Sequence, residues 1–262
     1  MAKYYFITTL LPQLKIGAPT EIDFRELDHL LRQNLTPHDF ANVTLLRRLV
    51  DLENVRLMWQ GKYVDGELIE SGGNFDEKEL EEILLHHEKL PDYLSQYMES
   101  YEEKSQRIAH FPELLRDFFR VERKKAIGFT EKFLTFEWQW RLVMTALRAF
   151  DLGRNLEQEF RFEDPEEPFI QYILEQKTSP SFDPPDAFKP LKTIFETKKS
   201  NPLELNLMLS EWRFEKIDEM VGWHTFDIDR VLGFVVQFDI CERWLRLDKK
   251  KGLQVVDRVA EG

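Results

Sequence analysis

The sequence is poor in cysteine and lacks a long apolar run. Cys241 is its single cysteine, so no disulfide can form within the chain, which is typical of a reducing compartment. The longest nearly apolar run, from Val231 to Phe238, is much shorter than the roughly 20 residues of a membrane-spanning helix. The start of the chain also lacks the long apolar core and cleavage site of a secretory signal. We therefore expect a cytoplasmic protein without a direct membrane span.

Basic residues are outnumbered by acidic ones. The chain has 36 Lys and Arg against 48 Asp and Glu, which gives a net charge of −12. This is the wrong sign for a protein that binds nucleic acid by neutralising phosphates, so nucleic acid is not expected as a partner. Disorder is excluded in turn by 21 Phe and 6 Trp, because disordered chains contain few aromatic residues. The sequence predicts a folded, acidic protein.

Motifs for catalysis and for nucleotide or dinucleotide cofactors are absent. The chain contains no Gly-x-Ser-x-Gly elbow, no Gly-x-x-x-x-Gly-Lys-Ser/Thr loop and no Gly-x-Gly-x-x-Gly turn. Cys241 lies in an apolar stretch with no feature that marks an activated thiolate. We therefore predict no catalytic residue and no cofactor.

A metal site is also not predicted. Glu26 and His29 have the Glu-x-x-His spacing of carboxylate-bridged di-iron bundles, but such sites need this motif twice. The second histidine group fails it, because Glu82 lies four residues before His86, and Glu88 follows His87. Glu26, His29 and His86 remain the residues to which an unrecognised enzyme site could be assigned.

Helical periodicity runs through most of the chain. Asp23 is a typical N-cap for a helix that ends near Asn34, and Thr36 with Pro37 predicts the start of a second helix that reaches about Trp59. Further helices are predicted to begin near Phe75, Pro91, Pro112, Thr130, Pro202 and Asp227, with the helix from Thr130 reaching Phe160. No long run alternates apolar and polar residues, so the fold class is all-α.

Three segments depart from this helical pattern. Tyr4 to Thr9 is aromatic and β-branched, which favours a short strand or a buried extended arm. Residues 61–73 are rich in glycine and predict a loop. Residues 163–200 contain six prolines and predict a connector with one or two brief helices.

A short pattern occurs three times, in which an apolar helix ends in Asp, followed by an aliphatic residue and then Asn or Arg. The pattern residues are Asp51 with Asn54, Asp151 with Asn155, and Asp239 with Arg243. They favour three pseudo-repeats within a single unit of residues 1–262, with tentative lobes at 20–62, 74–162 and 200–250. The alternative is that each Asp caps or bridges helices of the core.

Three segments of the chain resemble a known family. They are Tyr4 to Pro12, Arg47 to Asn54 and Asp227 to Trp244. They resemble an uncharacterised family encoded in bacterial V/A-type ATPase gene clusters, whose members look like divergent versions of the ATPase C subunit, the counterpart of the eukaryotic d subunit. This chain departs from an ordinary C subunit in being shorter and in its Pro-rich connector.

The resemblance implies a function. It implies a funnel-like or elongated arrangement of three helical lobes that couples the central stalk to the membrane rotor ring. The protein would then be a structural subunit without an active site in a proton- or sodium-translocating complex, peripheral to the inner membrane. Its partners would be the other ATPase subunits.

Two other functions stay open from the residues. One is a free-standing adaptor that uses the acidic run from Asp76 to Glu82 to bind a basic partner helix. The other is a helical enzyme with a spatially assembled site.

Overall fold

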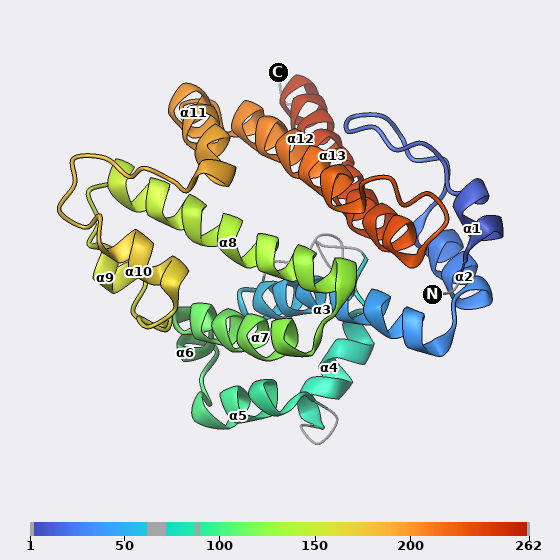
Figure 1. The fold of residues 1–262 in the computed structure, drawn as a ribbon, viewed down its shortest axis with the longest axis horizontal. Coiled ribbons are helices and arrows are strands. Elements are labelled where there is room, and N and C mark those ends of the chain that lie inside the picture. The colour runs from blue at the N-terminus through green and yellow to red at the C-terminus, as the bar shows by residue number, and fades with distance from the viewer. Residues whose placement is uncertain (1–2, 62–71, 87–89, 261–262) are drawn as a thin grey trace. The chain divides into compact units, whose positions relative to one another are not determined.

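A computed structural model describes residues 3–61, 72–86 and 90–260, and side chains up to residue 247 (Figure 1). These residues form helices and connecting loops without a strand, which confirms the all-α fold class. Within these ranges, no helix combines the length and the apolar composition needed to cross a membrane. The chain divides into two compact units. Unit 1 contains Met1–Leu90, Gly128–Thr130 and Ser210–Gly262, and unit 2 contains Pro91–Ile127 and Glu131–Leu209.

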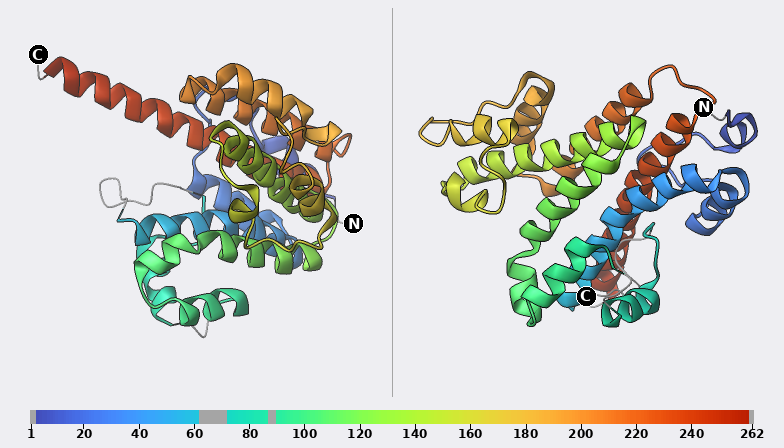
Figure 2. Two further views of the ribbon diagram at one scale, coloured as in Figure 1. Left: turned by 90° about the vertical axis from the view of Figure 1, so that its left-hand side faces the viewer. Right: turned by 60° about the horizontal axis from the view of Figure 1, so that its bottom comes forward.

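Unit 1 is built around two long helices, α3 and α13, which pack against each other (Figure 2). Its helices are α1 (Tyr5–Leu10), α2 (Phe24–Asn34), α3 (Pro37–Trp59), α4 (Glu77–Leu85), the second half of α12 (Pro202–Val221), and α13 (Ile228–Ala260). Helix α1 packs on both α2 and α13. The fully buried side chains of this core include Leu27, Leu31, Leu52, Phe234 and Phe238.

Local capping signals set the first two predicted helix boundaries. The Asp23 carboxylate accepts the backbone N–H of Glu26, and Glu26 in turn accepts the N–H of Asp23, which completes a capping box at the start of α2. Thr36 accepts the N–H of Asp39 and precedes Pro37 at the first position of α3. The predicted bounds of both helices are confirmed.

The predicted extended segment at the N-terminus is wrong. Residues Tyr5–Leu10 form helix α1, although their residue types favour a strand. The hydroxyls of Thr8 and Thr9 accommodate the helix by donating to carbonyls three and four residues earlier, at Tyr4, Tyr5 and Phe6. Helix α1 buries Ile7 and packs on α2 and α13. This packing outweighs the preference of its residues for a strand.

Unit 2 is a bundle of shorter helices around α7 and α8. Its helices are α5 (Asp92–Ser100), α6 (Lys104–Ala109), α7 (Phe111–Lys125), α8 (Gly128–Asp151, in this unit from Glu131), α9 (Leu156–Glu159), α10 (Pro168–Leu174), η2 (Asp186–Phe188), α11 (Lys189–Lys198) and the first half of α12. Helix α5 packs on α7 (Figure 1). Large side chains fill the core, among them Phe118, Leu134, Met144, Phe182 and Leu191.

Helix α8 ends earlier than its sequence predicts. We expect this helix to reach Phe160, but it stops at Asp151 and the short α9 follows. Gly153 adopts a φ of 61°, a conformation that glycine tolerates and that commonly closes a helix. Asn155 then caps α9 by accepting the N–H of Gln158.

The proline-rich connector contains the two brief α-helices α10 and α11, as predicted, together with the single turn η2. The tentative lobes correspond less simply to the two units. Residues 20–62 and 200–250 both contribute to unit 1, whereas residues 74–162 are divided between the units. The three lobes and the funnel stay predictions. Most of the predicted loop 61–73 lies outside the described residues. So does His87, which is considered together with His86 as part of a metal motif.

Candidate functional site

Asp51, the first residue of the repeated pattern, is buried in the middle of α3. Its side chain accepts the backbone N–H and the side-chain amide of Asn74, both at 2.7 Å. A Cβ on Gly73 would collide with the Asp51 carboxylate, so this position favours glycine. The residue is 5% exposed, and burial raises the pKa of Asp51 to about 6.

Asp239 and Arg243 lie on α13, where they form an ion pair at 2.9 Å. Asp239 faces the same Gly72–Asn74 segment, since a Cβ on Gly72 would lie 3.3 Å from its Oδ1. The buried Asn54 on α3 borders Gly73 from the other side. The structure therefore gathers the first and third copies of the pattern, on α3 and α13, around one short segment of unit 1.

The second copy has a different setting. Asp151 is the exposed last residue of α8 in unit 2, where it forms an ion pair with Lys199. Asp51 and Asp239, by contrast, lie well inside their helices, so the prediction that all three mark helix ends is wrong for these two. Asp51 is buried and hydrogen-bonded to Asn74, Asp151 is exposed and paired with Lys199, and Asp239 is paired with Arg243 on its own helix, so the three environments differ.

The residues considered for metal binding have other roles. Glu26 belongs to the capping box of α2, and His86 is the exposed C-cap of α4. His29 borders a cavity of about 390 Å³, beside the ion pair between Arg47 and Asp28 at 2.5 Å. In the described part of the chain, no three His, Cys, Asp or Glu side chains come close enough to hold a metal ion.

Cys241 and the acidic run also have local explanations. The thiol of Cys241 is buried in α13, and this burial raises its pKa to about 11. Asp76 and Glu79 form the capping box that begins α4. Their carboxylates therefore act on their own helix, and the acidic adaptor stays a prediction.

Four exposed aromatic side chains of unit 1 belong to α1 and to the α12–α13 loop, which contact each other. This aromatic surface consists of Tyr5, Phe6, Trp223 and Phe226. Trp223 is 88% exposed, Phe6 66% and Tyr5 58%. The rings of Tyr5 and Phe226 lie 4.9 Å apart, so residues distant in the sequence form one patch. Exposed apolar patches of this kind mark sites of protein interaction.

Polar contacts hold the aromatic surface in place. The N–H of Tyr4 donates to the carbonyl of Phe226 at 2.7 Å, which joins α1 to the loop. The Asp227 carboxylate forms an ion pair with Lys3 and a hydrogen bond with Nδ1 of His224 at 2.9 Å. Trp223 stacks on His224, with their ring centroids 5.2 Å apart. The backbone beneath the exposed rings is therefore fixed before any partner binds.

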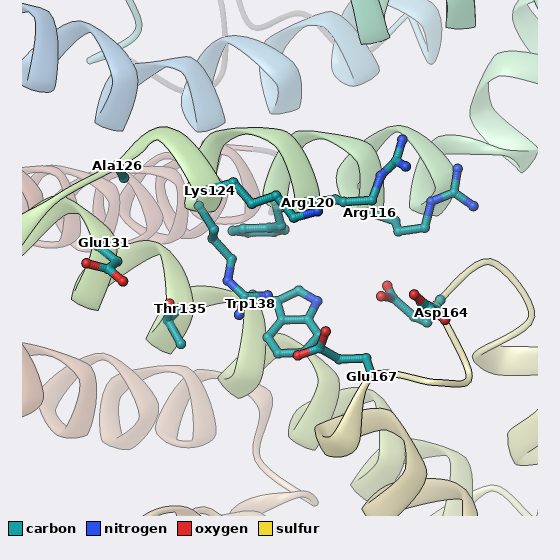
Figure 3. A pocket seen from close by; sticks show the side chains of 12 residues that line it. Arg116, Arg120, Lys124, Ala126, Glu131, Thr135, Trp138, Asp164 and Glu167 are labelled. Atoms are coloured by element: carbon teal, nitrogen blue, oxygen red, sulfur yellow. The ribbon is translucent and has the colours of Figure 1, made fainter.

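Unit 2 contains a second candidate site, a cavity of about 360 Å³ with charged walls. Its basic wall is α7, which contributes Arg116, Arg120, Arg123 and Lys124. The acidic residues Glu163, Asp164 and Glu167 come from the segment after α9, and Glu131 comes from α8. Figure 3 shows Arg116 and Arg120 along α7, with Asp164 and Glu167 across the cavity from them.

Neither site was found from the sequence. Trp223 follows Gly222, the glycine directly after the end of α12, which is the one local signal that the ring lies in a turn. The charged residues of α7 are typical of an ordinary solvated helix face, and nothing in the sequence places residues 163–167 opposite them.

Comparison with known proteins connects the chain to a family. Residues 1–262 match the family described as "Protein of unknown function (DUF2764)". The chain is 27% identical to a protein of Chlamydia muridarum, over 100% of this chain and 99% of the relative. It is 26% identical to a protein of Chlamydia trachomatis with the same coverage. Both relatives are named as uncharacterized proteins, and these descriptions mention no ATPase. No solved structure is significantly similar.

Proposed function

The chain belongs to the DUF2764 family, and we propose that it is a non-catalytic structural subunit that docks onto another protein through its aromatic surface. The observations that carry this proposal are the 88% exposure of Trp223 and, three residues further along the same loop, the exposed Phe226 ring in contact with Tyr5. An isolated exposed leucine needs no explanation, but clustered exposed aromatic rings do. Tryptophan and tyrosine are also the residues that most often dominate the binding energy of protein interfaces.

The fixed backbone beneath the surface favours the same conclusion. Tyr4 and Phe226 are joined by a hydrogen bond, and Lys3 and Asp227 by an ion pair, so a partner would not have to order these segments. Binding to a pre-organised surface avoids the entropy loss of ordering loops and side chains. The rings therefore offer apolar area at little conformational cost.

We further propose that the partner is a V/A-type ATPase, in which the protein couples the central stalk to the rotor ring. This part rests on the resemblance of Tyr4 to Pro12, Arg47 to Asn54 and Asp227 to Trp244. These three segments lie in α1, α3 and α13 and pack together in unit 1, where two of them adjoin the aromatic surface. The repeated pattern lends no support, because its three Asp residues have different environments.

Co-purification tests both parts. The protein is co-expressed with the central-stalk and rotor-ring subunits, and the complex is isolated under gentle conditions through a tag on the stalk. The proposal expects the wild-type chain in the complex. It expects Trp223→Ala to bind about 30-fold more weakly, because loss of a central aromatic residue typically removes about 2 kcal/mol or more.

Leu152→Ala is the control, since Leu152 is 60% exposed but belongs to unit 2 and is not part of the aromatic surface. It should bind as the wild type does. If the wild-type chain stays out of the complex, the ATPase assignment is wrong. If Trp223→Ala and Leu152→Ala both bind like the wild type, the aromatic surface is not the docking site.

A further inference from the structure

Four basic side chains line the charged cavity of unit 2, and two of them, Arg116 and Arg120, already have ion-pair partners. Arg116 forms an ion pair with Asp117 at 2.9 Å and donates to the carbonyl of Phe162 at 2.8 Å. Arg120 pairs with the same Asp117 at 2.9 Å. These two arginines stabilise the wall of the cavity, so neither of them needs a ligand.

Arg123 differs from its neighbours on α7. Its guanidinium lies over the ring of Trp138, with its central carbon 4.1 Å from the ring centroid. Its buried Nε has no hydrogen-bond partner, and the side chain makes no ion pair within the described residues. Burial lowers the pKa of Arg123 below its ordinary value, opposed by attraction from Glu167 and Glu163. Such a group is expected to have an acceptor.

The carboxylates that attract Arg123 lie across the cavity and do not touch it. Glu163 accepts a hydrogen bond from the indole of Trp138, and burial raises the pKa of Glu163. Glu167 lies at the N-cap of α10, where its carboxylate makes no capping hydrogen bond, and it lines the cavity. An arginine and a carboxylate that attract each other but stay apart leave room for a group between them that contacts both.

We propose that this cavity binds a small zwitterion of the amino-acid type, with its carboxylate on Arg123 and its ammonium group on Glu167. The cavity is lined by four basic and four acidic residues. A simple anion would therefore face the carboxylates, and a simple cation would face the arginines. A zwitterion satisfies both walls, because each of its charged groups meets the opposite charge.

Size and apolar surface agree with this class of ligand. A volume of about 360 Å³ lies at the lower end of small-molecule sites, which suits a compact molecule. Phe119 and Trp138 also line the cavity but are only 2% and 5% exposed, so the apolar surface is small and suits a ligand with a short side chain. The site lies wholly within unit 2, so this proposal is independent of the docking function proposed for unit 1.

Ligand-observed NMR on the full chain tests the proposal. The common L-amino acids are screened in small pools at up to about 10 mM each. We expect saturation transfer to at least one of them, and titration calorimetry then measures its affinity. The analogues without the amino group and without the carboxylate should each bind about tenfold more weakly or worse, because each loses one charged contact.

Two pairs of variants locate the site. Arg123→Met and Glu167→Gln should each weaken binding by about tenfold or more. Lys125→Met and Glu166→Gln make the same charge changes at exposed positions outside the cavity and should bind as the wild type does. Arg123→Lys, which keeps the charge, should retain part of the affinity and serves as the test if Arg123→Met fails to fold.

Three results would overturn the proposal. The first is that no common amino acid binds the wild-type chain. The second is equal affinity for an amino acid and its analogue without the amino group, which would make the cavity a simple anion site. The third is unchanged affinity in folded Arg123→Met or Arg123→Lys and in Glu167→Gln, which would place the binding elsewhere.

Discussion

Replacing Asp51 by asparagine is expected to change how the stability of the fold depends on pH. Burial raises the pKa of Asp51 from its ordinary 3.8 to about 6 in the folded chain. The folded protein therefore holds this proton more tightly than the unfolded chain does. The stabilisation from protonated Asp51 is fully present below pH 3.8 and is lost as the pH rises through about 6.

The size of the effect follows from the two pKa values. Each tenfold change in an ionisation constant corresponds to about 1.4 kcal/mol, so Asp51 contributes about 3 kcal/mol to the free energy of unfolding well below pH 3.8, about 2.5 kcal/mol at about pH 4 and almost nothing at about pH 7. Asparagine has no such contribution. It also loses one of the two hydrogen bonds from Asn74, which costs about 1–3 kcal/mol at every pH.

The assay is urea unfolding followed by far-UV circular dichroism between about pH 4.5 and pH 7.5. The stability of Asp51→Asn relative to the wild type should improve by about 2 kcal/mol over this range. Glu21→Gln controls for the loss of one negative charge, because Glu21 is an exposed acid of the same unit. If the difference between Asp51→Asn and the wild type is the same at all pH values, burial does not hold a proton on Asp51.

Three further outcomes are expected. Gly73→Ala should lower the free energy of unfolding by about 1–3 kcal/mol in urea titrations, because its Cβ would strike Asp51, and unchanged stability would contradict that contact. Thr36→Ala should cost about 1 kcal/mol through loss of the α3 cap, whereas Thr193→Ala, at an exposed helix position, should cost less. The buried Cys241 thiol, with its pKa of about 11, should react slowly with a thiol reagent at about pH 8 and much faster in urea, and rapid reaction of the native protein would show that it is accessible.

The helices were predictable where a local signal marks their ends. Asp23 and Thr36 act on backbone groups three residues away, so their effect can be read from a short window of sequence. Prediction failed where distant contacts compete with local preference. Tyr5–Leu10 is helical because it packs on α2 and α13, and α8 ends at Asp151, where Gly153 adopts a positive φ.

The candidate sites depended on contacts between segments far apart in the chain. Tyr5 and Phe226 share one surface because Tyr4 is hydrogen-bonded to Phe226, a pairing with no counterpart in the sequence pattern. Arg123 and Arg120 differ in their contacts. The guanidinium of Arg123 lies over Trp138, whereas Arg120 forms an ion pair with Asp117. Residue type and spacing are alike for both arginines.

By itself, the sequence determined an acidic, all-helical protein and the ends of its best-capped helices, because hydrophobic periodicity and capping act within a few residues. The tertiary structure alone decided which charges are buried and which are paired. It placed Asp51 beside Gly73, left Arg123 without an acceptor and turned Trp223 outward. The burial and ion pairing of a side chain depend on which distant segments of the chain pack against it, and this packing exists only in the folded protein.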